Sequence, residues 1–145
     1  MTVKELSQLY YLNREIEMDQ KRLEELKAKI GLQAQRLTGM PRSSNKTDNH
    51  TERLVAEMVD LQAIIEAKQI QCIHERSRLE RYIENIEDSE TRMMFTLRFI
   101  NGLSWYQVAR HMGDGYIGDN LKKKCYRYLK ANKDEQDQLN AMDDV

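Results

Sequence analysis

The sequence predicts an all-α protein: a long, antiparallel helical hairpin resembling a coiled coil, then a C-terminal three-helix domain containing a helix-turn-helix. Apolar residues recur every seven positions along two long segments, which predicts packed helices. Beyond residue 100, helical apolar spacing surrounds a glycine-rich turn. The chain of 145 residues has one proline and 32% charged residues, a composition typical of long helices. We expect the hairpin at residues 1–87, the helix-turn-helix domain at 88–130 and an acidic tail at 131–145.

The first predicted helix spans residues 3–37. Its seven-residue repeat consists of Leu9, Ile16, Leu23, Ile30 and Leu37. Leu12 and Leu26 occupy companion positions, whereas Asp19 and Gln33 make this second seam half polar. Strict seven-residue spacing with charges between the apolar positions predicts coiled-coil packing. Gly31 is expected to weaken the last turns by about 1 kcal/mol relative to alanine.

A loop is expected at residues 38–50, where turn-forming glycine, proline, serine and asparagine are concentrated. Arg42 and Lys46 make this loop mildly basic. Two interpretations remain open at this point: a flexible connector, or an arm that touches DNA phosphates.

The second predicted helix spans residues 51–87, with Thr51 or Asn49 as its N-cap. Its repeat consists of Met58, Ile65, Cys72, Leu79 and Ile86. The companion positions hold Leu54, Leu61 and Tyr82, and they are interrupted by Lys68 and Glu75. Each long helix would extend about 50 Å, so the two are expected to fold back on each other. Two helices alone bury too little apolar surface, which favours a homodimer or higher homo-oligomer over a hairpin covered by its own chain.

A third helix is expected to begin at Asp88 and Ser89, with Glu90 in its first turn. Its predicted inner face contains Met93, Met94, Leu97 and Ile100, with Phe95 and Phe99 beside them. Ser104 and Gln107 then form a capping box. The apolar stripe of the capped helix is Trp105, Val108, Ala109 and Met112, and small Ala109 allows close approach of a second helix. Gly113 suits the left-handed residue after a helix.

The last predicted helix is basic on one side and apolar on the other. It is expected to bury Leu121, Cys125 and Tyr128. The residues predicted to lead it into the major groove of DNA are Gly118, Asp119, Asn120, Lys122 and Lys123. Asn120 is expected to contact adenine and the lysines guanine. Phosphate contacts are expected from Lys124, Arg127 and Lys130, with Tyr106 of the preceding helix touching the backbone. The alternative is a helical pair that merely packs and leaves its lysines in solvent.

Residues 97–109, Leu-Arg-Phe-Ile-Asn-Gly-Leu-Ser-Trp-Tyr-Gln-Val-Ala, resemble the region-4 helix-turn-helix of sigma-70-type factors. The chain as a whole resembles the small late-transcription regulators of phages and prophages of Gram-positive bacteria, the RinA/ArpU-like group. A linker of that group is similar to Gly39-Met40-Pro41-Arg42-Ser43-Ser44, followed by Glu52 and by Val59-Asp60-Leu61. The matches together extend from Gly39 to Lys130.

This resemblance implies a sequence-specific DNA-binding transcription regulator that acts at late phage promoters. Double-stranded DNA and bacterial RNA polymerase are the implied partners. The turn at residues 114–120 is slightly longer than in the sigma-type pattern, which affects which residues begin the last helix.

Charge and cysteine content limit the class of protein and the compartment to be expected. A formal net charge of −1 excludes a protein that is basic throughout, but a basic segment at 116–130 precedes an acidic one at 131–145. The two cysteines, Cys72 and Cys125, fall on apolar stripes and are expected to be buried thiols in a reducing cytoplasm. Lys4 and Glu5 interrupt any apolar start, so no signal peptide is expected, and no run is long enough to span a membrane. We expect a cytoplasmic protein of a bacterial host cell.

Enzymatic chemistry is not expected. The sequence has no phosphate-binding glycine loop and no serine or cysteine with a plausible base. Cys72 and His74 would point to different helix faces, and His50 and His111 are isolated, so no metal or cofactor is predicted. Two other functions remain open: a phage DNA-packaging protein of the small-terminase kind, and a coiled-coil protein-interaction module. A ring of many subunits would favour packaging, and absence of duplex binding at low salt would favour protein interaction.

Overall fold

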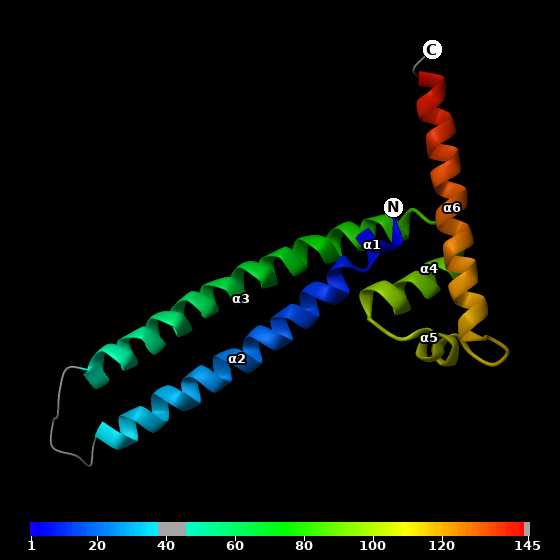
Figure 1. Ribbon diagram of the computed structural model, residues 1–145. Coiled ribbons are helices and arrows are strands. Elements are labelled where there is room, and N and C mark those ends of the chain that lie inside the picture. The colour runs from blue at the N-terminus through cyan, green and yellow to red at the C-terminus, as the bar shows by residue number, and fades with distance from the viewer. Residues whose placement is uncertain (38–45, 144–145) are drawn as a thin grey trace. The chain divides into compact units, whose positions relative to one another are not determined.

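The computed structural model describes residues 1–37 and 46–143 (Figure 1). Its helices are α1 (Val3–Leu6), α2 (Gln8–Leu37), α3 (Lys46–Glu84), α4 (Ser89–Phe95), the π-helix η1 (Thr96–Ile100), α5 (Trp105–Met112) and α6 (Gly118–Asp143). These two described ranges contain no β-strand, so the predicted all-α class is confirmed. The chain forms two compact units: Leu12–Ile73, and Met1–Tyr11 together with the chain from His74 onward.

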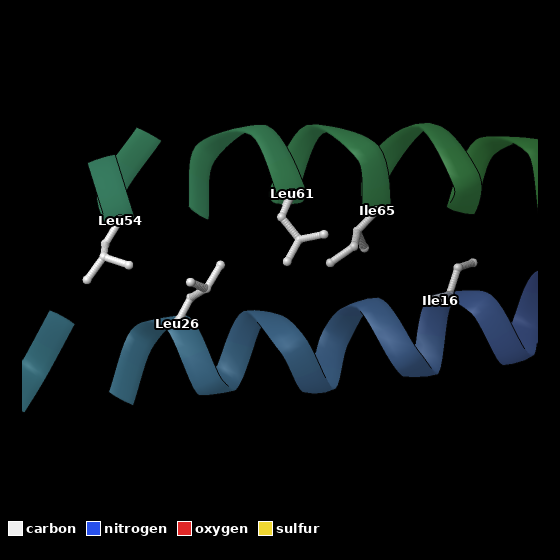
Figure 2. Close-up of a cluster of buried hydrophobic side chains, with 5 residues drawn as sticks. All are labelled: Ile16, Leu26, Leu54, Leu61 and Ile65. Carbon is white, nitrogen blue, oxygen red and sulfur yellow. The ribbon is translucent and has the colours of Figure 1, made fainter. Parts of the chain in front are cut away.

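The Leu12–Ile73 unit is an antiparallel pair formed by α2 and α3. Its apolar core consists of Ile16 and Leu26 from α2 and Leu54, Leu61 and Ile65 from α3, each between 5% and 8% exposed. Figure 2 shows these side chains pointing toward one another across the helix pair. Leu23, Ile30 and Cys72 pack against this core and are partly buried. The predicted seven-residue seam is therefore the surface on which the two helices meet.

The polar residues that interrupt the seam pair across the two helices. Lys68 Nζ lies 2.6 Å from Asp19 Oδ2 and 3.5 Å from Glu15. The Thr51 hydroxyl donates to Gln33 Oε1 at 2.8 Å. The Lys68 and Asp19 side chains are 26% and 22% exposed, so the ion pair is largely shielded. A one-residue slip would separate these partners, and such polar pairs are known to select helix register.

The boundaries of the long helices differ from those predicted. Helix α3 begins at Lys46, so Asn49 and Thr51 lie within it and do not cap it. Thr51 is a weak helix former, but its hydroxyl has a partner on the facing helix, Gln33. Helix α3 ends at Glu84, three residues early. The rest of the predicted loop, residues 38–45, lies outside the described residues.

The start of the chain also departs from one continuous helix. Ser7 separates α1 from α2, although its backbone stays in the right-handed helical region. Thr2 caps α1 through a capping box: Glu5 N–H donates to Thr2 Oγ1 at 3.2 Å, and Thr2 N–H donates to Glu5 Oε2 at 2.7 Å. This pairing lowers the pKa of Glu5, chiefly through the backbone hydrogen bond from Thr2.

The other unit, which we call the C-terminal unit, is broader than residues 88–130, because it also includes Met1–Tyr11, with the start of α2, and the end of α3 from His74. Its buried apolar side chains are Leu6, Leu9, Leu79, Ile83, Ile86, Met94, Phe95, Phe99, Val108, Ala109, Leu121, Cys125 and Leu129. The Phe95 ring lies edge-on to those of Phe99 and Tyr128, with ring centroids 5.4 Å apart in each case. Aromatic packing thus joins α4, η1 and α6.

The inner face of α4 and η1 was predicted only in part. Met94, Phe95 and Phe99 are buried, but Met93 is 46% exposed. Met93 lies one residue before Met94, so its side chain projects from a different face of the helix. The π-helix, in which Asn101 N–H donates to Thr96 O at 3.0 Å, changes the spacing so that Phe99 is buried and Ile100 only half-buried. A wider turn of this kind cannot be inferred from a 3.6-residue period.

The predicted acidic tail is not a separate element. Helix α6 continues through it to Asp143. Between Asp119 and Asp143 the chain has no glycine or proline, and alanine, leucine, lysine, glutamate and glutamine favour helix. The change from basic to acidic residues therefore occurs within one helix.

Candidate nucleic-acid interface

Helix α5 begins as predicted. Gln107 N–H donates to Ser104 Oγ at 3.3 Å, and Ser104 N–H donates to Gln107 Oε1 at 3.0 Å. This reciprocal capping box satisfies two backbone donors that the first turn of a helix otherwise leaves without partners. Val108 and Ala109 are buried on its inner face. The local sequence therefore fixes both the start of α5 and the side that faces the core.

Arg98 positions the loop before α5. Its Nη1 donates to Leu103 O at 2.8 Å, and its guanidinium lies 5.0 Å from the centroid of the Trp105 ring. Trp105, predicted to lie on the apolar stripe of this helix, is half-buried beneath this cation. Two residues of the Leu-Arg-aromatic segment thus stabilise this unit. Phe99 packs in its core, and Arg98 holds the start of α5.

The turn between α5 and α6 differs from the prediction in two ways. Gly113 has φ 118° and ψ −174°, which is not the left-handed helical conformation expected of it. This region is open essentially to glycine alone. Because α6 already begins at Gly118, the turn comprises residues 113–117, and the last three residues of the predicted long turn are helical.

Gly118 permits the closest approach of the two helices. A Cβ on Gly118 would lie 3.0 Å from both the carbonyl carbon and oxygen of Trp105, and 3.2 Å from Tyr106 N. Gly118 therefore has a packing role in the structure, and the DNA contact predicted for it stays a prediction. Ala109, at which this close approach was expected, is also buried.

Helix α6 presents three of its basic residues opposite its buried face. Leu121, Cys125 and Leu129 are buried. Three residues with helical spacing on the far side are exposed, and we call them the basic stripe: Lys123, Arg127 and Lys130. The remaining predicted groove residues Asp119, Asn120 and Lys122 are exposed in the first two turns of the helix. Helix geometry thus brings most of the predicted DNA-contact residues to one surface.

Lys124 does not belong to that surface. Its Nζ lies 2.6 Å from Glu90 Oε1 and 3.8 Å from Asp88 Oδ2, which ties α6 to the start of α4. This ammonium group therefore has two carboxylate partners in the structure, and the phosphate contact predicted for Lys124 stays a prediction. Hydrogen bonds from the Thr91 hydroxyl and N–H, together with nearby Lys124, keep the pKa of Asp88 below its usual value.

The basic stripe ends where the exposed face of α6 changes sign. Asp134 and Asp137 follow Lys130 at the same helical spacing, and both are exposed. From Gly118 to Lys130 the helix extends about 18 Å, calculated from its rise per residue. The positively charged length of this face is therefore limited to its first half.

Two residues of α5 adjoin the first turn of α6. Tyr106 is 69% exposed, and the contact with DNA backbone predicted for it stays a prediction. The Arg110 guanidinium lies 5.9 Å from the centroid of the Tyr106 ring. Arg110 was not predicted as a contact residue, although its position four residues after Tyr106 indicates a shared helix face.

The buried thiol of α6 is chemically protected. Cys125 is 1% exposed, and its burial raises its pKa to about 12. Cys72, predicted to be buried, is only half-buried, and its Sγ lies 3.6 Å from Asn13 Oδ1. Among the described residues, no group of three or more histidine, cysteine or acidic side chains is placed to hold a metal ion.

Among the described helices, none combines the length and hydropathy needed to cross a membrane. Comparison with known proteins finds no matching family model, no matching curated protein and no matching solved structure.

Proposed function

We propose that the protein is a sequence-specific DNA-binding transcription regulator that uses α5 and α6 as a helix-turn-helix. The observation that carries this proposal is the basic stripe on α6, which follows a capped and closely packed α5. The exposed face of α6 is free of the core, as a helix that enters the major groove requires. The resemblance of residues 97–109 to sigma region 4 supports the same assignment.

In this proposal α6 lies in the major groove with its first turns toward the base edges. The amide of Asn120 pairs with adenine, and Lys123 contacts guanine. Arg127 and Lys130 hold phosphates further along the helix and set its position on the duplex. Lys124 maintains the contact between α6 and α4 and makes no DNA contact. Sequence discrimination is therefore assigned to the exposed side of the first turns.

The resemblance to the RinA/ArpU-like group supports a more specific role. We propose action at late promoters of a phage or prophage, in the cytoplasm of the bacterial host and together with its RNA polymerase. No catalytic role or cofactor is part of the proposal.

We also propose that the hairpin unit joins two copies of the chain. On α3, Val59, Ile70 and Ile73 are 54%, 57% and 66% exposed and share one face with Val55. Val55 and Val59 are spaced from residue 64 about as far as Ile73 and Ile70 are on its other side. An antiparallel pairing of α3 with a second α3 would therefore bring apolar residues together at both ends.

A binding selection from random duplex DNA at physiological salt, with the purified protein, tests the proposed function. One enriched motif is expected. Affinity for that motif is then measured against salt concentration for Arg127→Gln, a proposed phosphate contact, and for Lys133→Gln, a matched control beyond the basic stripe on the same helix. The first substitution should reduce the salt slope by about one and the second should leave it unchanged. Weak, motif-free and salt-labile binding would contradict a sequence-specific regulator.

A further inference from the structure

A cavity of about 580 Å³ opens beside the first turn of α6. We call it the turn cavity, and it is lined by Tyr106, Ala109 and Arg110 of α5 and by Gly113, Asp114, Gly115, Tyr116, Ile117 and Gly118. The close contact of Gly118 with the Trp105 backbone places α6 against the start of α5 at this point. The cavity is therefore continuous with the surface from which the α6 stripe begins.

The walls of the turn cavity include one cation, Arg110, and one carboxylate, Asp114. In the part of the chain that the structure describes, no ion pair engages either of them. The Tyr106 ring braces the Arg110 guanidinium, which reduces the side-chain entropy that Arg110 would lose on binding an anion. The hydroxyl groups of Tyr106 and Tyr116 add hydrogen-bond donors.

We propose that the turn cavity holds one phosphate of the DNA backbone, with Arg110 as its charged contact. This inference rests on the proposed function. A planar guanidinium donates two parallel hydrogen bonds to phosphate oxygens, which suits a phosphate held against a fixed wall. In a helix-turn-helix the helix before the recognition helix crosses the sugar-phosphate backbone, and Arg110 lies on that helix.

Asp114 moderates this contact because its carboxylate repels a phosphate in the same cavity. Because the two residues have opposite charges, replacing each with a neutral side chain should change DNA affinity in opposite directions. Arg110→Gln should weaken binding, and Asp114→Asn should strengthen it. Neither should alter which bases are preferred, because a phosphate contact carries no direct sequence information.

The experiment measures affinity of the full-length protein for its selected duplex across a range of salt concentrations. Arg110→Gln should reduce the salt slope by about 0.9, the value for one phosphate on duplex DNA, and Arg110→Lys should retain it. The matched control is Arg81→Gln, an exposed residue at the end of α3 in the same unit. Fluorescence of the single tryptophan, Trp105, verifies that each variant is folded.

An unchanged salt slope in Arg110→Gln, with wild-type binding intact, would overturn the inference and leave the proposed function standing. Failure of the wild type to bind any duplex would overturn both. Titration with inorganic phosphate distinguishes a free anion from a DNA phosphate. Phosphate binding that depends on Arg110 without any change in the duplex salt slope would indicate a site for a free anion and contradict the DNA assignment.

Discussion

Replacing Gly118 with alanine tests the closest contact between α5 and α6. The added Cβ would lie 3.0 Å from the Trp105 carbonyl carbon and oxygen, which are backbone atoms and cannot rotate away. Ordinary carbon contacts are about 3.5–4.0 Å, so the neighbouring backbone would have to move away by a few tenths of an ångström. Since the capping box holds the start of α5, that movement disturbs the whole turn.

The expected free-energy change is the balance of two opposing effects. Overpacking of a close contact costs about 1–3 kcal/mol. Loss of glycine freedom in the unfolded chain stabilises the variant by about 0.4–1 kcal/mol. The net result is a destabilisation of about 1–2 kcal/mol, which lowers the urea midpoint by about 0.5–1 M for a typical denaturant dependence.

Urea unfolding followed by Trp105 fluorescence measures this effect at the contact itself, because the protein has a single tryptophan. Gly31→Ala is the matched control, since a Cβ on Gly31 of α2 meets no atom within 4 Å. That control should stabilise the helix by about 1 kcal/mol, opposite in sign to Gly118→Ala. A Gly118→Ala variant as stable as the wild type, with an unchanged Trp105 spectrum, would refute the close-packing argument.

Four further predictions concern other parts of the chain. Because burial raises the pKa of Cys125 to about 12, iodoacetamide at pH 8 should label it only as fast as the protein unfolds, which peptide mass spectrometry can measure; rapid labelling of folded protein would be inconsistent with that burial. The pKa of Lys68 is raised above 10.5 by its hydrogen bond to a carboxylate, so the pair stabilises the hairpin below that pH and is lost as pH rises through the raised pKa. Lys68→Met should therefore lower the urea midpoint at pH 7 and differ less from the wild type at pH 11, and a constant difference would contradict this assignment. Lys124→Gln should reduce stability without changing the salt slope of DNA binding, and a lower slope would show a phosphate contact instead. Val59→Asp should halve the mass seen in analytical ultracentrifugation, whereas Met18→Asp on exposed α2 surface should not; equal masses for Val59→Asp and wild type would argue against pairing through α3.

The hairpin core was predictable because the spacing of apolar residues along each helix is local and periodic. A seven-residue spacing defines which side of each helix is apolar, whatever lies opposite, and Leu61 and Ile65 are buried as that spacing requires. The pairing of Lys68 with Asp19 was not predictable in the same way. These residues are 49 positions apart, and only the register of the folded helices brings them together. In the sequence, Asp19 and Lys68 each appear only as a polar residue that interrupts an apolar repeat.

In the candidate site, too, the features set by neighbouring residues were predictable and those set by tertiary contacts were not. The Ser104 capping box involves residues three apart and was predicted correctly. Lys124 has the same local character as Lys123, and the difference between them depends on Glu90 at the start of another helix. The role of Gly118 likewise depends on the backbone of Trp105. Residue type and spacing thus found the surface, while tertiary partners decide which of its residues are available.

The charges of α6 run against the preference of an isolated helix. A helix dipole has its positive end at the N-terminus, where acidic side chains stabilise it, and its negative end at the C-terminus, where basic ones do. In α6 five of the six basic residues lie between Lys122 and Lys130, and four of the five acidic residues follow from Asp134 on; Asp119 in the first turn and Lys133 are the exceptions, and the last turn has no basic residue. Side-chain charge and backbone dipole therefore add in one direction. A polyanion near α6 would be drawn to the N-terminal half and repelled from the C-terminal half, and in the proposed function this field would orient an approaching duplex before any base is contacted.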